Sequence, residues 1–119
     1  MIVAGFGFRT GASQDSFKDA LAQASADHAP SAFATLADKA DGLRAFAEAR
    51  CIPLIAVDPI AAQSQQTRTL SAASLAHKFT GSVAEATALA AAGPNARLAG
   101  PRAISTDRMA TCAIAIGDT

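Results

Sequence analysis

A glycine-rich stretch with one arginine, VAGFGFRTGAS, follows the first apolar residues of the chain. Gly5, Gly7 and Gly11 would let the backbone approach a ligand closely, and the amides of a following helix start would point outward. Arg9 and Thr10 can add charge-assisted hydrogen bonds to a carboxylate or a phosphate. The stretch therefore predicts either an anion-binding turn or a tight chain reversal with a solvated arginine, and spacing alone leaves both open.

The standard nucleotide motifs do not fit this stretch. The dinucleotide fingerprint G-x-G-x-x-G needs a third glycine to pack helix against strand. Thr10 stands in that place, and Gly11 comes one residue late. A P-loop also fails, because no Lys-Ser or Lys-Thr pair follows the glycines. A nucleotide-binding domain is therefore disfavoured.

Few other side chains have a spacing that indicates catalysis or metal binding. Ser13 and Ser82 are expected to cap helices, and Glu85 stands in the S-x-x-E relation of a capping box to Ser82. For His28, before a proline at an expected helix end, and for His77, a structural or solvated role is favoured over a catalytic one. No cluster has metal-ligand spacing, so no metal and no cofactor are predicted.

Length and composition exclude several classes of function. The 119 residues are expected to form one domain over residues 1–119, and ten basic residues balance ten acidic ones at a pI of about 6.7. This balance gives no field that would attract nucleic acid or a membrane surface. Arg97, Arg102 and Arg108 gather near the C-terminus without interleaved aromatic residues. No apolar run is long enough to span a bilayer and no secretory signal is recognisable, so a cytoplasmic location is expected.

Residue usage also bears on the core and on assembly. Alanine dominates the apolar residues, and Tyr and Trp are absent. A small domain with small side chains gains from burying more surface, so a homo-oligomer is a reasonable expectation. Cys51 and Cys112 stand alone and far apart, which favours buried reduced thiols over a disulfide.

Strand-like and helix-like segments alternate along the chain. A first strand over residues 1–8 precedes a helix that begins after Ser13 and ends before Pro30. Further expected elements are a strand at 32–36, a helix capped by Asp41, a strand at 54–57, a loop at 61–69, a short helix at 70–78, a helix from Ser82 to a capping Gly93, and a hairpin ending in a strand at 110–116. This alternation predicts an α/β fold, with a mixed, mostly parallel sheet of about four to five strands.

With these segments in order, the chain resembles the cobalamin-biosynthesis family comprising CobE and the C-terminal domain of CbiG. Four stretches carry the resemblance, in the family's order and over nearly the whole length: VAGFGFRTGAS, DKADGLRAFAEARCIPLIAV, TGSVAEATALAAAG and ATCAIAI. The resemblance implies a three-layer α/β/α fold and a role in building the corrin ring of vitamin B12. It is nearer to the free-standing CobE type than to full-length CbiG, whose activity opens a lactone ring on a cobalt-precorrin with loss of acetaldehyde.

The resemblance also implies which residues touch a ligand, a flat macrocycle fringed with carboxylates. Positions that match the family are Gly5, Gly7, Arg9, Gly11, Ser13, Lys39, Gly81, Val83 and Glu85; beside them Thr10, Ser82 and Arg102 complete the expected ligand-binding set. Two departures stand out: KADGL is shorter than in relatives and lacks their proline, and Arg102 stands where relatives often carry lysine.

The sequence leaves two functions open. The first is an accessory protein of the aerobic corrin pathway that binds a precorrin or hydrogenobyrinic-acid-type intermediate and hands it on, with other cobalamin-biosynthesis enzymes as partners. The second is a precorrin-modifying enzyme resembling the CbiG lactone hydrolases. The first is slightly favoured, because no nucleophile, base and acid stand out together.

Overall fold

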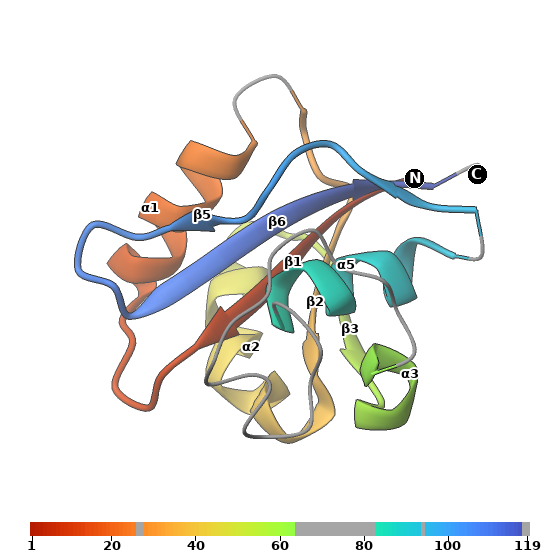
Figure 1. Ribbon diagram of the computed structural model, residues 1–119. Coiled ribbons are helices and arrows are strands. Elements are labelled where there is room, and N and C mark those ends of the chain that lie inside the picture. The colour runs from red at the N-terminus through yellow and green to blue at the C-terminus, as the bar shows by residue number, and fades with distance from the viewer. Residues whose placement is uncertain (26–27, 64–82, 94, 118–119) are drawn as a thin grey trace.

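The computed structural model describes residues 1–25, 28–63, 83–93 and 95–117 (Figure 1). Its elements in chain order are β1 (Ile2–Phe8), α1 (Gln14–Ala24), β2 (Ala32–Leu36), the short 3-10 helix η1 (Ala37–Lys39), α2 (Ala40–Ala49), β3 (Leu54–Val57), α3 (Pro59–Gln63), α5 (Val83–Ala92), β4 (Arg97–Leu98), β5 (Ala103–Ile104) and β6 (Ala110–Ile116). The helix expected at 70–78, with His77, lies outside the described residues.

One mixed sheet runs through the middle of the molecule, with strand order β3-β2-β1-β6-β4 and β5 beside β6. Strands β1, β2 and β3 are parallel, whereas β6 runs antiparallel to β1, β4 and β5. The predicted α/β class with a mixed sheet is confirmed. Within the described residues the sheet has six strands, and two of its five pairings are parallel. This share is smaller than expected, because two-residue strands such as β4 and β5 show no alternation in sequence.

Helices cover both faces of this sheet, which gives the three layers expected from the resemblance (Figure 1). On one face, α1 and α2 enclose a cluster of phenylalanines in which the Phe6 ring contacts its neighbours edge to face. The ring of Phe6 lies 5.2 Å from that of Phe33 and 6.0 Å from those of Phe17 and Phe46. Phe6 has no exposed surface and is a core residue, whereas Phe8 at the end of β1 is half-buried.

The other face of the sheet packs against α5, with α3 beside it (Figure 1). Helix α5 is buried around most of its circumference, and its buried residues are mainly alanines. Gly5 of β1 lies directly beneath this helix, where an added Cβ would stand 2.2 Å from the Ala84 carbonyl oxygen. The small side chains therefore serve a close approach of helix and sheet.

The helix ends agree with the sequence in two cases and differ in one. Ser13 caps α1 as predicted, since its hydroxyl accepts a hydrogen bond from the Ser16 amide at 3.3 Å. Gly93 ends α5 with a φ of +107°, the left-handed conformation that favours glycine. The prediction that Asp41 caps α2 is wrong, because the helix already begins at Ala40 and Asp41 pairs with Arg44 on its surface at 3.2 Å. Ser82 lies outside the described residues.

The two cysteines are free, as predicted, but they differ in environment. Cys112 in β6 is fully buried, and burial raises the pKa of its thiol. Cys51 lies in the turn before β3 and is exposed, so the expectation that it is buried is wrong. None of the helices in the described segments is long and apolar enough to cross a membrane.

Candidate functional site

The loop that follows β1 is tied to the loop that precedes β6. The Arg9 amide donates a hydrogen bond to the Met109 carbonyl at 2.9 Å, which extends the β1–β6 pairing by one step beyond Phe8 and Ala110. The loop then turns through Gly11, whose φ of +94° a side-chain-bearing residue would adopt only with strain. Arg9 is exposed at this end of the sheet.

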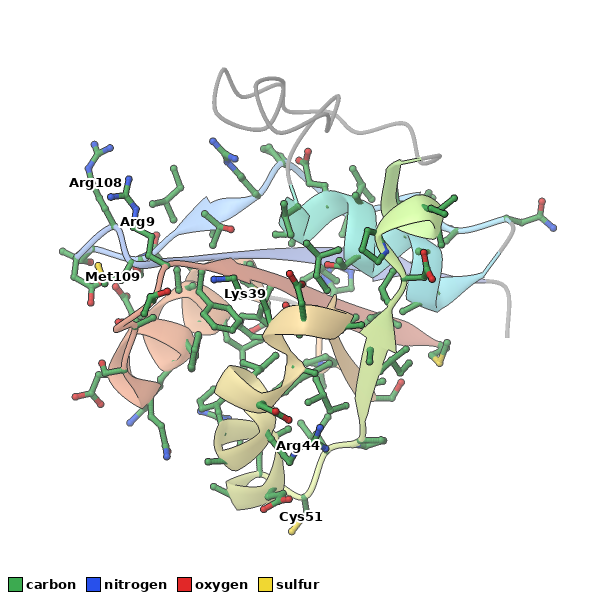
Figure 2. The ribbon with its side chains drawn as sticks, turned by 90° about the horizontal axis from the view of Figure 1, so that it is seen from below. Arg9, Lys39, Arg44, Cys51, Arg108 and Met109 are labelled. Carbon is green, nitrogen blue, oxygen red and sulfur yellow. The ribbon has the colours of Figure 1, made fainter. Side chains whose placement is uncertain are left out.

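A first hollow, of about 360 Å³, opens beside this tie and is called here the arginine hollow. Its walls combine three arginines with apolar and hydroxyl groups: Gly7, Phe8, Arg9, Val83, Arg102, Ile104, Arg108, Met109, Ala110 and Thr111. Figure 2 shows Arg9 and Arg108 close together beside Met109, pointing the same way. Three arginines that line one hollow form a site suited to a carboxylate or another anion.

A second hollow, of about 300 Å³, adjoins the first and is called here the lysine hollow. It is lined by Phe8, Arg9, Thr10, Gly11, Ala12, Asp38, Lys39 and Gly42. The Lys39 ammonium stands 5.6 Å from the centre of the Phe8 ring, within the range of a cation–π contact. Phe8 and Arg9 line both hollows, so they form a ridge between them.

The structure brings most of the expected ligand-binding residues to this one end of the sheet. Arg9, Thr10, Gly11 and Lys39 line the lysine hollow, while Gly7, Arg9, Val83 and Arg102 line the arginine hollow. The carboxyl ends of the parallel strands β1 and β2 meet at the same sheet edge, which explains why Arg9 and Lys39 are neighbours.

Three of the expected ligand-binding residues have a different place. Gly5 is in the middle of β1 and contacts α5, so it serves packing and not the loop. Ser13 caps α1 and lines neither hollow. Glu85 is fully buried and accepts a hydrogen bond from the Arg102 amide at 3.1 Å, so it holds the chain behind the arginine hollow and is not among its lining residues. Gly81 and Ser82 lie outside the described residues.

Six residues that line the arginine hollow are outside the ligand-binding set expected from the sequence: Phe8, Ile104, Arg108, Met109, Ala110 and Thr111. In the sequence, Arg108 stands out only as one of three basic residues near the C-terminus. The signal that could have placed it is the antiparallel pairing of the last strand with β1, which sets Phe8 opposite Ala110 and therefore Arg9 beside residues 108 and 109.

The turn that carries Arg108 is held by two carboxylates. Hydrogen bonds from the Ser105 and Ser16 hydroxyls and from the Met109 amide lower the pKa of the Asp107 carboxyl. The Thr106 amide, helped by the Gln23 side chain, lowers the pKa of the Asp19 carboxyl. Both groups therefore remain ionised to a lower pH than a free aspartate does, and their hydrogen bonds hold the turn in its observed shape.

The chemistry available at this end of the sheet is anion binding. The described walls of the two hollows contain four cations, the hydroxyls of Thr10 and Thr111, and a single carboxylate, Asp38. Neither His nor Cys is among these described wall residues. Across residues 1–25, 28–63, 83–93 and 95–117, no three His, Cys, Asp or Glu side chains gather closely enough to hold a metal ion.

Fold and site together define an α/β/α protein with two cation-lined hollows at the carboxyl ends of its first two strands, and the comparisons with known proteins give its family. The family described as Cobalamin synthesis G C-terminus matches residues 2–115. The chain belongs to this family and is a protein of cobalamin biosynthesis. The search of curated protein sequences found no match.

Solved structures agree with this assignment. The structure of CobE, a protein from the cobalamin (vitamin B12) biosynthetic pathway, superimposes with a TM-score of 0.81 at 30% identity, covering 97% of this chain and 89% of that one. The cobalamin biosynthesis protein chiG from Agrobacterium tumefaciens str. C58 gives 0.76 at 32% identity and covers all of both chains. A cobalamin biosynthesis protein G homolog from Sulfolobus solfataricus, at 17% identity and a TM-score of 0.71, shares the fold and covers 96% of this chain and 36% of that one.

Proposed function

We propose that this protein binds a carboxylate-bearing corrin precursor, a precorrin or a hydrogenobyrinic-acid-type intermediate, at the rim formed by the two hollows. The observation that carries the proposal is the grouping of Arg9, Arg102, Arg108 and Lys39 around two adjoining hollows in a protein of this pathway. Such an intermediate is an apolar ring with several acetate and propionate arms, so it needs separate anion contacts around a flat surface.

The size of the hollows supports binding at their edge. Each is at the low end of the volumes found for small-molecule pockets, roughly 300–1,000 Å³, and is too small for a whole macrocycle. Each accommodates a carboxylate arm. The ring itself would then lie across the ridge of Phe8 and Arg9, with the apolar side chains of Ile104 and Met109 beside it.

A binding and carrier role agrees better with these walls than catalysis does. The four cations can grip carboxylates, whereas the described walls offer Asp38 alone as a carboxylate for proton transfer. The protein would hold the intermediate and pass it to another cobalamin-biosynthesis enzyme.

Direct binding of the pigment tests the proposal. The chain has no Trp or Tyr, so the visible absorption of the ligand is the useful signal. Purified protein is mixed with hydrogenobyrinic acid, and separately with precorrins, and passed through a gel-filtration column. Co-elution with unchanged pigment mass supports the proposal. A mass change would make the protein an enzyme, and pigment that elutes free would refute the proposal.

Substitutions at the rim locate the site. Arg9→Ala should weaken binding by about 1.5–3 kcal/mol, the usual worth of a hydrogen bond to a charged group, or roughly 10- to 150-fold in Kd. Arg44→Ala is the matched control, because Arg44 is an exposed cation of α2 that lies away from Arg9 in Figure 2. A pigment whose carboxylates have been converted to neutral amides should bind poorly to all forms. Equal affinity of the Arg9 and Arg44 variants would place the ligand elsewhere.

A further inference from the structure

The carboxylate of Asp107 joins three donors from two separate parts of the chain. One of its oxygens, Oδ2, accepts a hydrogen bond from the Ser16 hydroxyl of α1 at 2.6 Å. The other, Oδ1, accepts from the Ser105 hydroxyl at 2.5 Å and from the Met109 amide at 3.0 Å. Asp107 therefore closes the turn before β6 and fastens it to the first helix.

Arg108 sits between these anchored points in an unfavourable backbone conformation. Its φ is +61°, the left-handed region that non-glycine residues rarely occupy and that persists only where surrounding contacts enforce it. The Arg108 amide donates to the Ser105 carbonyl at 2.8 Å. Both neighbours of Arg108 are held by the same carboxylate. Asp107 precedes Arg108 and carries this carboxylate, and Met109 follows Arg108 and donates its amide hydrogen to it.

The same contacts reach the loop that carries Arg9. The Ser16 hydroxyl that donates to Asp107 also accepts from the Ser13 amide at 3.2 Å, at the end of that loop. The Met109 carbonyl accepts from the Arg9 amide at 2.9 Å. Arg9 and Arg108 line the arginine hollow together and point the same way in Figure 2, so their relative position depends on this junction.

We propose that Asp107 is a positioning residue of the ligand site, which holds Arg9 and Arg108 as a pair that grips one carboxylate arm of the ligand in the arginine hollow. This inference rests on the proposed function. Asp107 itself lines neither hollow, so it acts through the two arginines. The pairing adds specificity: an arm that bears a carboxylate meets two guanidinium groups in a fixed arrangement, while an amidated arm cannot neutralise them.

A set of double variants tests the proposal with hydrogenobyrinic acid as the probe. Asp107→Ala should weaken binding about five- to tenfold in the wild-type background and less than about twofold in Arg108→Ala, because residues that act together are not additive. In the Lys39→Ala background the loss should stay about five- to tenfold, since Lys39 lines the other hollow. Asp107→Asn keeps the size of the side chain and provides a second variant if Asp107→Ala does not fold. Asp107→Asn should weaken binding less than Asp107→Ala does, again with a smaller effect in the Arg108→Ala background than in the wild-type and Lys39→Ala backgrounds.

A measurement without ligand separates this proposal from the proposed function. Nitrogen-15 relaxation of the unliganded protein should show ordered amides at Arg108 and Met109, and a loss of that order in Asp107→Ala. Asp15→Asn is the control, because Asp15 carries the same charge in the first turn of α1. It should leave both the order and the affinity unchanged.

The outcomes are distinct. If the wild-type protein binds no pigment, the proposed function fails, while loss of order at Arg108 in Asp107→Ala would still support the role of Asp107 in positioning Arg108. If the protein binds pigment and Arg108→Ala weakens that binding, unchanged affinity of the Asp107 variants overturns the positioning role. An equal loss in the Arg108→Ala and Lys39→Ala backgrounds also overturns it, because a general loss of structure would act on both.

Discussion

Replacement of Gly5 by alanine distinguishes a packing glycine from a ligand-binding one. A Cβ at this position would lie 2.2 Å from the Ala84 carbonyl oxygen, 2.6 Å from the Ala88 amide nitrogen and 2.8 Å from the Ala88 Cβ. Non-bonded contacts of carbon are favourable near 3.5 Å, so α5 would have to retreat by roughly 1 Å. Two of the three obstacles are backbone atoms, which cannot rotate away.

The expected change in the free energy of unfolding of Gly5→Ala is the difference between two opposing effects. Overpacking of a well-packed core costs about 1–3 kcal/mol, and contact with helix backbone places Gly5 at the upper end. Alanine also stabilises the folded state by about 0.4–1 kcal/mol, because it restricts the unfolded chain more than glycine does. The net loss should be about 2 kcal/mol, or roughly 6–10 °C in Tm for a chain of this size.

Thermal and urea unfolding followed by far-ultraviolet circular dichroism measures this loss in a protein that lacks Trp and Tyr. Gly100→Ala is the matched control, since no atom lies within 4 Å of its added Cβ. It should stay within about 0.5 kcal/mol of the wild type. A Gly5→Ala protein that is as stable as this control would refute the packing argument. Wild-type stability combined with lost pigment binding would return Gly5 to the ligand site.

Three further predictions concern the cap, the thiols and acid stability. Ser13→Ala should cost about 1 kcal/mol in urea unfolding through loss of the α1 cap, and an unchanged midpoint would contradict the capping role. A thiol reagent should modify Cys51 in the folded protein and Cys112 only after unfolding, so equal rates for both would show that β6 is more accessible than described. The pKa of Asp107 is lower in the folded state than in the unfolded chain, so its contribution to stability is present above about pH 4 and is lost as the pH falls through the folded value. Asp107→Asn should therefore flatten the fall of stability below about pH 4 in acid titrations, and an unchanged slope would mean that the three hydrogen bonds do not matter to folding.

Local features of the sequence were sufficient for much of the fold. Apolar runs and helix periodicity placed β1, β2, β3, β6 and α1 close to their observed bounds, because these elements bury residues at regular spacing. The Ser13 cap of α1 and the end of α5 at Gly93 could also be predicted from the sequence, since both depend on contacts within a few residues. The cap assigned to Asp41 failed because the preceding 3-10 helix leads directly into α2.

The sequence predicted only part of the candidate site. Arg9 and Lys39 both belong to the expected ligand-binding set, and the structure places them together because parallel neighbouring strands end at the same edge of a sheet. The roles of Gly5 and Glu85 could not be predicted from the sequence, because both depend on contacts between residues far apart in the chain. Gly5 packs against Ala84, and Glu85 accepts a hydrogen bond from the Arg102 amide.

The sequence by itself determined the α/β class, the family and the glycine-arginine loop at the first strand end. Only the tertiary structure decided what stands opposite that loop. The antiparallel pairing of β6 with β1 brings residues about 100 positions apart into register, and it sets Arg108 beside Arg9. No local pattern specifies such a partner, because register between distant strands is fixed by the packing of both sheet faces and by the Asp107 turn.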